Sequence, residues 1–200
     1  MKKISVLFVL LIACFATVYA GETSINRMVL KAANEFDEIN VSGDVTVEMR
    51  YNPKWAGYIV YHYDKNVDKK VRCHNKESVL YVDGASEGIM SRIVVFYGNP
   101  LKAVVHNGDA RLVSKKIVSN PTEFKIIVNG SVDVKLGNVE TDNAKFIINN
   151  NGGLYIRNVD IKNVDAVING AGKVVMKENP QSLNVIKNGS GNVQSENYNY

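Results

Sequence analysis

A repeat of about 20 residues in the second half of the chain limits the possible folds more than any other sequence feature. Residues 126–143 align without a gap on residues 146–163, so that the segment IIVNGS falls on FIINNN. Further copies begin at Ala166, at Val185 and, more loosely, at Val104. A fixed period held through several copies is the signature of stacked structural units.

Each copy contains an apolar pair, an asparagine turn, a short alternating strand and a second polar turn. The turn asparagines are Asn107, Asn129, Asn149, Asn169 and Asn188. Seventeen of the 24 asparagines lie after residue 100, and asparagine suits turns that need left-handed backbone. We predict that these five residues stack at equivalent corners as a structural turn ladder, with side-chain amides that pair between units.

Two folds fit this pattern. Asn-Gly between alternating apolar residues is also a hairpin signal, so an antiparallel β meander or sandwich is the alternative. A unit with two different corners, at roughly 3.3 Å per extended residue, better suits a three-sided coil. The 29 valines favour strands. The expected fold is therefore all-β, a right-handed parallel β-helix or β-solenoid with rungs of about 20 residues.

The first half also alternates in short runs, but without the period. No convincing amphipathic helix is present, and residues 26–34 are the only short candidate. We predict a cap or linker over residues 21–35, one solenoid-like domain over residues 36–196 and a tail over residues 197–200. Within the domain, residues 36–103 are expected to form irregular strands and residues 104–193 the repeat rungs.

The first twenty residues have the features of a secretory signal. Lys2 and Lys3 precede an apolar run, and Val18-Tyr19-Ala20 places small residues where a signal peptidase cleaves. The run is too short to span a bilayer comfortably. The protein is expected to be exported to the periplasm, the outer surface or the medium, with no transmembrane span after cleavage. The alternative is a lipoprotein anchored through Cys14, because residues 11–14 resemble a lipobox.

Removal of the signal lowers the formal charge, because 22 basic minus 20 acidic residues leaves +2. No basic cluster denser than residues 69–72 remains, which argues against a nucleic-acid partner. Cys73 then has no intramolecular disulfide partner and is interpreted as a small buried side chain.

Catalytic and metal-binding patterns are absent from the sequence. The spacing of His62, His74 and His106 matches no metal motif, so we expect no metal and no cofactor. Paired carboxylates would suit a glycosidase. The repeat alignment brings only Glu140 and Asp160 into one column. We therefore expect no enzyme activity.

Strand and turn patterns in a fixed order connect the chain to a known family. Residues 36–47 carry alternating Ile and Val around Gly43, residues 93–97 read IVVFY, and the glycine-containing turns at Asn169 and Asn188 close the series. In these features the chain resembles the auto-transporter adhesins with a head GIN domain, over roughly residues 34–196. The resemblance implies an all-β, solenoid-like, exported protein, and no catalytic residue carries over.

An aromatic cluster is the most suggestive surface feature. Flat rings offer contact area with few rotamers to immobilise, so they suit sugar stacking or a protein anchor. The candidate ligand-binding residues are Trp55, Tyr58, Tyr51 and Tyr61. Strand alternation also favours core or edge packing for Tyr61 and Tyr63.

The main hypothesis is an exported, non-enzymatic adhesin-like or envelope protein that binds an extracellular glycan or surface protein. A polysaccharide-active solenoid enzyme and a purely structural envelope module are the alternatives. The ends of a solenoid are open sheet edges, through which the protein could form a homo-oligomer.

Overall fold

A computed structural model describes residues 25–31, 35–64, 71–84 and 91–195, and the expected signal peptide, Cys14 and the tail lie outside these ranges. The strands are β1 (Ile25–Lys31), β2 (Glu38–Ser42), β3 (Val45–Tyr51), β4 (Tyr58–Asp64), β5 (Arg72–Lys76), β6 (Val79–Asp83), β7 (Ser91–Tyr97), β8 (Ala103–Gly108), β9 (Arg111–Ile117), β10 (Glu123–Gly130), β11 (Val134–Asn149), β12 (Gly153–Asn169), β13 (Lys173–Met176), β14 (Ser182–Lys187) and β15 (Asn192–Ser195). A short 3₁₀ turn, η1 (Pro53–Trp55), precedes β4.

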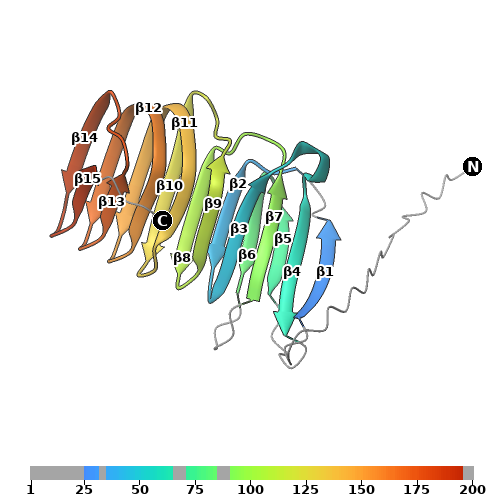
Figure 1. Cartoon of the computed structure of the whole chain (residues 1–200). Helices are drawn as coiled ribbons and strands as arrows, with labels where there is room; N and C mark the ends of the chain where they lie inside the picture. Colours follow the sequence, from blue (N-terminus) through green and yellow to red (C-terminus); the bar gives the residue numbers. More distant parts are fainter. Residues whose placement is uncertain (1–24, 32–34, 65–70, 85–90, 196–200) are drawn as a thin grey trace, which may run out of the picture.

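The strands stack in parallel into a β-solenoid, as the repeat predicts (Figure 1). One side, called here the first side, consists of β6, β2, β8, β10, the second halves of β11 and β12, and β14. The second side consists of β7, β3, β9, the first halves of β11 and β12, β13 and β15. The long strands β11 and β12 run from the second side to the first and so connect the two.

The register of the stack reproduces the sequence repeat. Asn129 lies beside Asn149, and Asn149 beside Asn169, so one coil of the solenoid corresponds to one copy of the repeat. Within β11 the in–out alternation slips at Gly137 and again at Asp142, which divides the strand into three straight segments. These two corners bend one continuous strand around the core.

The first half also forms coils, but they are stacked out of sequence order. The pair β6–β7 stacks on β2–β3, and β2–β3 then stacks on β8–β9. Val41 consequently lies beside Val82 on one neighbouring coil and beside His106 on the other. The expected irregular strands over residues 36–103 are therefore coils whose neighbours are distant in the sequence, which is why no regular period is visible there.

Antiparallel pairing is confined to the N-terminal end of the described solenoid. There β4 pairs antiparallel with β7, β1 with β4, and β5 with β6. A helix over residues 26–34, the short candidate from the sequence, is wrong, because residues 25–31 form an edge strand that pairs with β4. The meander alternative is wrong for the remaining described strands, which pair in parallel.

The core is a set of columns in which one inward side chain from each coil contacts the next. The column Leu112, Val134, Leu154 and Val174 is fully buried. On the first side, Phe124 and Phe146 are the bulkiest fully buried side chains among the described residues. Burial of these apolar columns is the main stabilising contribution in a chain without an intramolecular disulfide among the described residues.

Candidate functional site

The aromatic cluster begins at η1, in the turn between β3 and β4. Asn52 caps this turn by accepting the Lys54 N–H at 3.1 Å, and Pro53 restricts its backbone. The turn presents Trp55, whose ring lies 5.6 Å from the ring of Tyr58 and 5.7 Å from that of Phe96. Trp55 nevertheless stays 45% exposed. A large indole is thus held in place by two rings while part of it remains open to solvent.

Trp55, Tyr58 and Phe96, called here the aromatic cluster, lie on the outer surface of the second side. Phe96 is partly exposed and alternates with the core residues Val95 and Tyr97. Phe96 was not among the residues expected from the sequence. Its role depends on the contact between β7 and the turn after β3, and these two segments are far apart along the chain.

The structure separates Tyr51 and Tyr61 from this cluster. Tyr51 is 42% exposed, but its ring packs edge-on against the buried Tyr97 with centroids 5.6 Å apart. None of the described ring contacts joins Tyr51 to Trp55. Tyr61 is a core residue with 6% exposure, so its side chain is removed from the candidate ligand-binding set. Strand alternation, which points Tyr61 inward, is the physical reason.

The asparagines of the expected turn ladder form a continuous chain of side-chain hydrogen bonds along the first side. Each Nδ2 group donates to the Oδ1 atom of the preceding coil, at distances of 2.6 to 2.8 Å. The chain starts where Asn107 donates to Asn40 at 2.8 Å and runs through Asn129, Asn149 and Asn169 to Asn188. Because each interior amide both donates and accepts, the ladder has a structural role between coils.

The backbone of these asparagines differs from the expectation of left-handed turn residues. The first four lie in strands, and none of the five has positive φ. The left-handed conformation is adopted one residue later, by Gly108, Asn150 and Gly170. An extended backbone keeps the amides in strand register, at a spacing of about 4.8 Å that suits amide-to-amide bonding.

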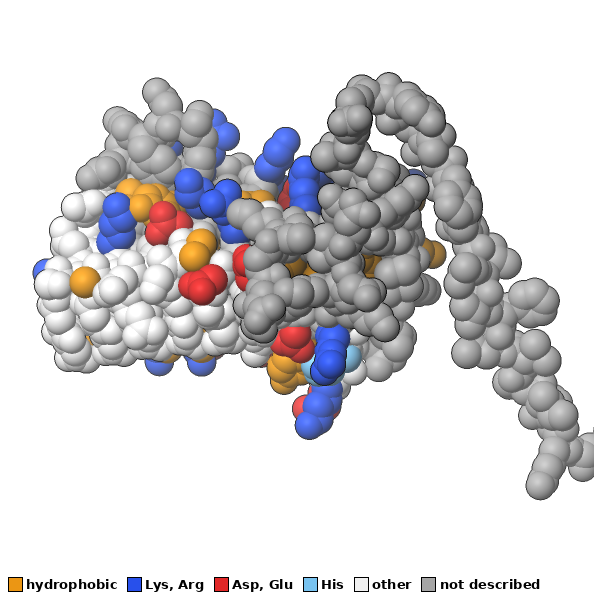
Figure 2. Space-filling model, turned by 90° about the horizontal axis from the view of Figure 1, so that it is seen from below, with side chains coloured by type: hydrophobic (Ala, Val, Ile, Leu, Met, Phe, Trp, Pro, Cys, Tyr) orange, Lys and Arg blue, Asp and Glu red, His pale blue; other side chains and the backbone are white. Residues whose placement is uncertain are grey.

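The turns after Asn149, Asn169 and Asn188 contain no charged residue and give one end of the C-terminal coils an uncharged surface. These turns lie at the lower end of the molecule in Figure 1. Figure 2, which looks at that end, shows a broad white area of uncharged side chains and backbone over the C-terminal coils. The residues there are Asn, Gly and Ser, as in residues 188–191 (NGSG).

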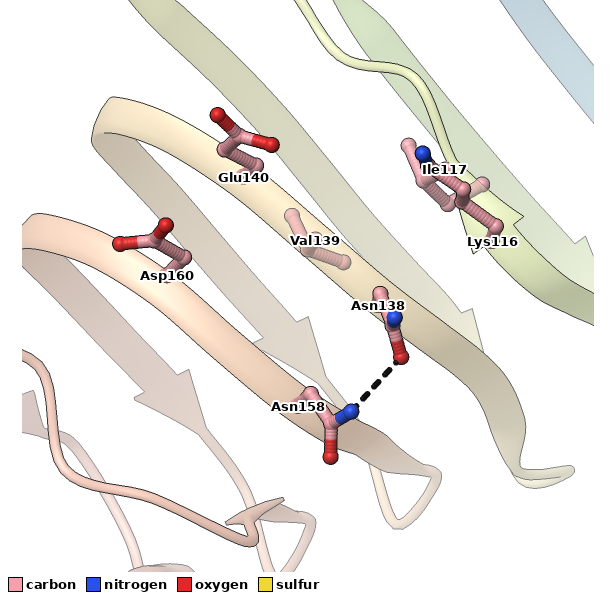
Figure 3. Close-up of a pocket in the computed structure, with 7 residues that line it drawn as sticks. All are labelled: Lys116, Ile117, Asn138, Val139, Glu140, Asn158 and Asp160. Atoms are coloured by element: carbon pink, nitrogen blue, oxygen red, sulfur yellow. Dashed lines mark hydrogen bonds between the residues drawn. The ribbon is translucent and has the colours of Figure 1, made fainter.

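The carboxylate column expected from the repeat is present in an open hollow of about 200 Å³ (Figure 3). Glu140 and Asp160 lie side by side on β11 and β12, and Lys116 comes from β9. The Nδ2 group of Asn158 donates to Oδ1 of Asn138 at 2.9 Å along its floor. Both carboxylates point outward from neighbouring strands, as solvated acids do, and the hollow offers no enclosed position between them.

The histidines are apart from one another in the described part of the chain. His106 is fully buried, and His74 stacks on Tyr81 with ring centroids 4.8 Å apart. Burial lowers the pKa of His106, although its bond to the Ala110 carbonyl opposes this. No group of three metal-binding side chains occurs among the described residues.

The thiol of Cys73 is packed against the core. Burial raises its pKa to about 11, against the effect of a hydrogen bond with Tyr61 and with a further contribution from the charge of Asp83. The thiol therefore stays protonated, and a protonated thiol is a poor nucleophile.

Within the described ranges, no helix has the length and apolar character required to cross a membrane.

Solved structures that are similar to this chain include proteins described as putative adhesins. One from Parabacteroides distasonis is 14% identical, with 88% of this chain and 77% of that chain covered and a TM-score of 0.61. Another, from Bacteroides fragilis, is 12% identical over 86% of this chain and 97% of that chain, with a TM-score of 0.49. A putative lipid binding protein from Parabacteroides distasonis is 15% identical over 87% and 98% of the two chains, with a TM-score of 0.43.

At 14% identity, the putative adhesin from Parabacteroides distasonis shows that the two proteins have a common fold and nothing more. No curated protein sequence matches the chain. The family model described as "Putative auto-transporter adhesin, head GIN domain" matches residues 35–199, which is nearly the whole region that forms the solenoid. The chain therefore belongs to this adhesin family, as its strand and turn patterns indicate.

Proposed function

We propose that the protein is an exported, non-enzymatic adhesin that binds an extracellular carbohydrate through the aromatic cluster. The observation that carries the proposal is the position of Trp55, which is 45% exposed on the outer surface and is held in place by contacts with Tyr58 and Phe96. A braced ring loses little rotamer entropy when it stacks on a sugar face. The adhesin family and the signal-like first twenty residues support the exported location.

The test is carbohydrate binding by the mature protein, residues 21–200, on a glycan array and by titration with each hit. Trp55→Ala and Tyr58→Ala should weaken binding by at least about tenfold, because a central aromatic anchor contributes on the order of 2 kcal/mol. Tyr81→Ala is the matched control, since Tyr81 is a partly exposed tyrosine stacked on a ring on the first side. Equal binding by the two variants and the wild type, with folding unchanged, would refute the site.

Assembly through the C-terminal coil is a second candidate function, favoured by the exposure of apolar side chains there. On β14, Leu183 is 42% and Ile186 is 50% exposed. Their neighbours on the preceding coil are less exposed, because Val164 is buried and Val167 is partly buried. An open coil end of this kind suits stacking of a second copy. Analytical sedimentation of the wild type and of Ile186→Lys tests this. The wild type should form a dimer or larger assembly, and Ile186→Lys should be monomeric. A monomeric wild type would exclude assembly through this coil.

A further inference from the structure

A row of basic side chains crosses the outer surface of the second side. Its members alternate with core residues along each strand and therefore point away from the core. They are Arg92 on β7, Arg50 on β3, Arg111 and Lys115 on β9, Lys135 on β11, Arg157 on β12 and Lys173 on β13. Each of these side chains is exposed.

The six strands that carry this row, called here the basic strip, are consecutive neighbours in the sheet. At about 4.8 Å between strands, the basic strip extends for roughly 24 Å along the solenoid axis. At least one cation therefore occurs at every strand spacing. A straight row of this kind matches an extended, linear polyanion better than a compact anion.

Beyond the corners of β11 and β12, the outward positions of these two strands carry Glu140 and Asp160. Before these corners, the outward positions of the six strands hold the seven cations of the strip and one carboxylate. That carboxylate, Glu48, is 7% exposed and is paired with Arg50 at 2.7 Å and with Arg92. Just before β11, Asp133 accepts the Gly153 N–H at 3.0 Å. Lys115 lies one strand spacing from Glu48 along the stack.

The outward positions of the first side are balanced. Counted together with β5, which pairs with β6 at its edge, they carry four basic and four acidic residues, namely Arg72, Lys76, Lys125 and Lys145 against Glu38, Asp83, Glu123 and Asp165. The charge of the protein is therefore distributed unequally between its sides. In Figure 2 several blue side chains lie along the upper margin, over the coils, with orange and red ones among them.

A tyrosine lies within the basic strip. The Nζ atoms of Lys135 and Lys173 lie 5.8 and 5.1 Å from the centre of the Tyr155 ring, one from each neighbouring coil. The ring is partly exposed, and Arg157 is the next outward residue on the same strand. A sugar ring that carries an acidic group could stack on Tyr155 while its anion contacts the two ammonium groups.

We propose that the basic strip binds a linear acidic polysaccharide laid along the solenoid axis, with Tyr155 as a stacking position. The inference rests on the proposed carbohydrate function and adds the charge class of the ligand. The two surfaces are continuous, because Arg50 lies in register with Phe96 of the aromatic cluster. Within the strip itself, the apolar outward residues Val94 and Val175 are at most 4% exposed, so the strip offers a polysaccharide its charges but offers a membrane little apolar surface.

The test compares two double variants of the mature protein with the same change of charge. Lys115→Gln with Lys135→Gln removes two cations from adjacent coils of the strip. Lys125→Gln with Lys145→Gln removes two from adjacent coils of the first side. The probes are heparin and alginate as sulfated and carboxylated polysaccharides, dextran as a neutral one, and phosphatidylglycerol vesicles. Circular dichroism establishes that both variants are folded.

The strip variant should bind heparin and alginate about fivefold more weakly than wild type, and the first-side variant should bind as wild type does. Binding should also weaken as salt is raised. Equal losses in both variants, or binding to vesicles but not to heparin or alginate, would overturn the inference. If dextran binding depended on Trp55 and the strip variant bound heparin as wild type does, the inference about the basic strip would be overturned. The proposed carbohydrate function would then still stand. Absence of binding to every polysaccharide would overturn both.

Discussion

Asn129 donates its side-chain amide to Oδ1 of Asn107 across 2.8 Å, and the two residues occupy the same position in neighbouring coils. The backbone of each coil is already hydrogen-bonded to the next through the parallel β-sheet. The amide chain adds a second line of hydrogen bonds, which runs along the stack in one direction. This line also sets register, because a slip of one residue would place each asparagine opposite a core side chain.

Loss of one asparagine from the middle of the ladder should therefore destabilise the protein. Asn149 donates at 2.6 Å to Asn129 and accepts at 2.8 Å from Asn169, so Asn149→Ala removes two hydrogen bonds. We expect the free energy of unfolding to fall by about 1–2 kcal/mol in urea titrations. Asn151→Ala, in the exposed turn two residues later, is the control and should change it by less than about 0.5 kcal/mol. Equal effects of the two variants would contradict a stabilising ladder.

The corner at Gly137 should not tolerate a side chain. A Cβ atom there would lie 1.6 Å from the backbone oxygen of Lys115 in the preceding coil. Gly137→Ala must separate two coils and is expected to cost at least about 3 kcal/mol, or to prevent folding.

Gly108→Ala is the comparison for Gly137→Ala. At Gly108 the nearest atom would be 3.7 Å away, and only the positive φ of 72° opposes alanine. The expected cost is about 1 kcal/mol. Thermal unfolding of the two variants measures the difference, and a Gly137→Ala protein as stable as Gly108→Ala would show that the coils can separate at this corner.

Stability should decrease in mild acid because of His106. Burial lowers its pKa below 6.5, and its Nδ1 has no hydrogen-bond partner among the described residues. The unfolded chain therefore binds a proton at a pH where the folded chain does not, so stability falls as pH drops below about 6.5. His106→Val should flatten this dependence between pH 7 and pH 5, since Val41 and Val128 hold the equivalent positions of adjacent coils.

The control for His106→Val is His74→Gln, which changes an exposed histidine. Urea titrations at several pH values give the slope for each variant. If the dependence of the unfolding free energy on pH persisted in His106→Val and disappeared in His74→Gln, the acid sensitivity would come from His74 and the prediction would be wrong.

Glu48 should contribute to stability in the neutral range. Burial alone would raise the pKa of this carboxyl, but the hydrogen bonds and charges of Arg50 and Arg92 outweigh it and bring the pKa below 4.5. The stabilisation is therefore complete above about pH 4.5 and is lost as pH falls through the folded value.

Glu48→Gln should lower the unfolding free energy at pH 7 by about 1–2 kcal/mol, because two arginines lose a charged partner. The difference from wild type should be smaller at pH 3 than at pH 7, because the stabilisation is lost progressively as pH falls below 4.5. Urea titrations at both pH values measure this, and a difference that is the same at pH 3 and pH 7 would argue against the ion pairs as its source. Glu123→Gln, an exposed change on the first side, is the control.

The sequence by itself determined the class of fold and the position of the ladder. Both depend on information of short range, namely alternation with a period of two and a repeat whose copies follow one another directly along the chain. Ile126, Phe146 and Ala166 are equivalent residues of consecutive copies, and the structure stacks them directly. Where the chain winds in sequence order, a periodic pattern is sufficient to assign neighbours.

Only the tertiary structure decided the order of the first coils and the surfaces of the second side. Val41 meets the distant His106 because the β4–β7 segment folds back to the other side of β2–β3, and no local pattern encodes that return. The repeat spacing of Lys115 and Lys135 is visible in the sequence, but Arg92 and Arg50 join them only through this stacking. Trp55, Phe96 and the basic strip lie on one surface because parallel coils align side chains that are far apart along the chain.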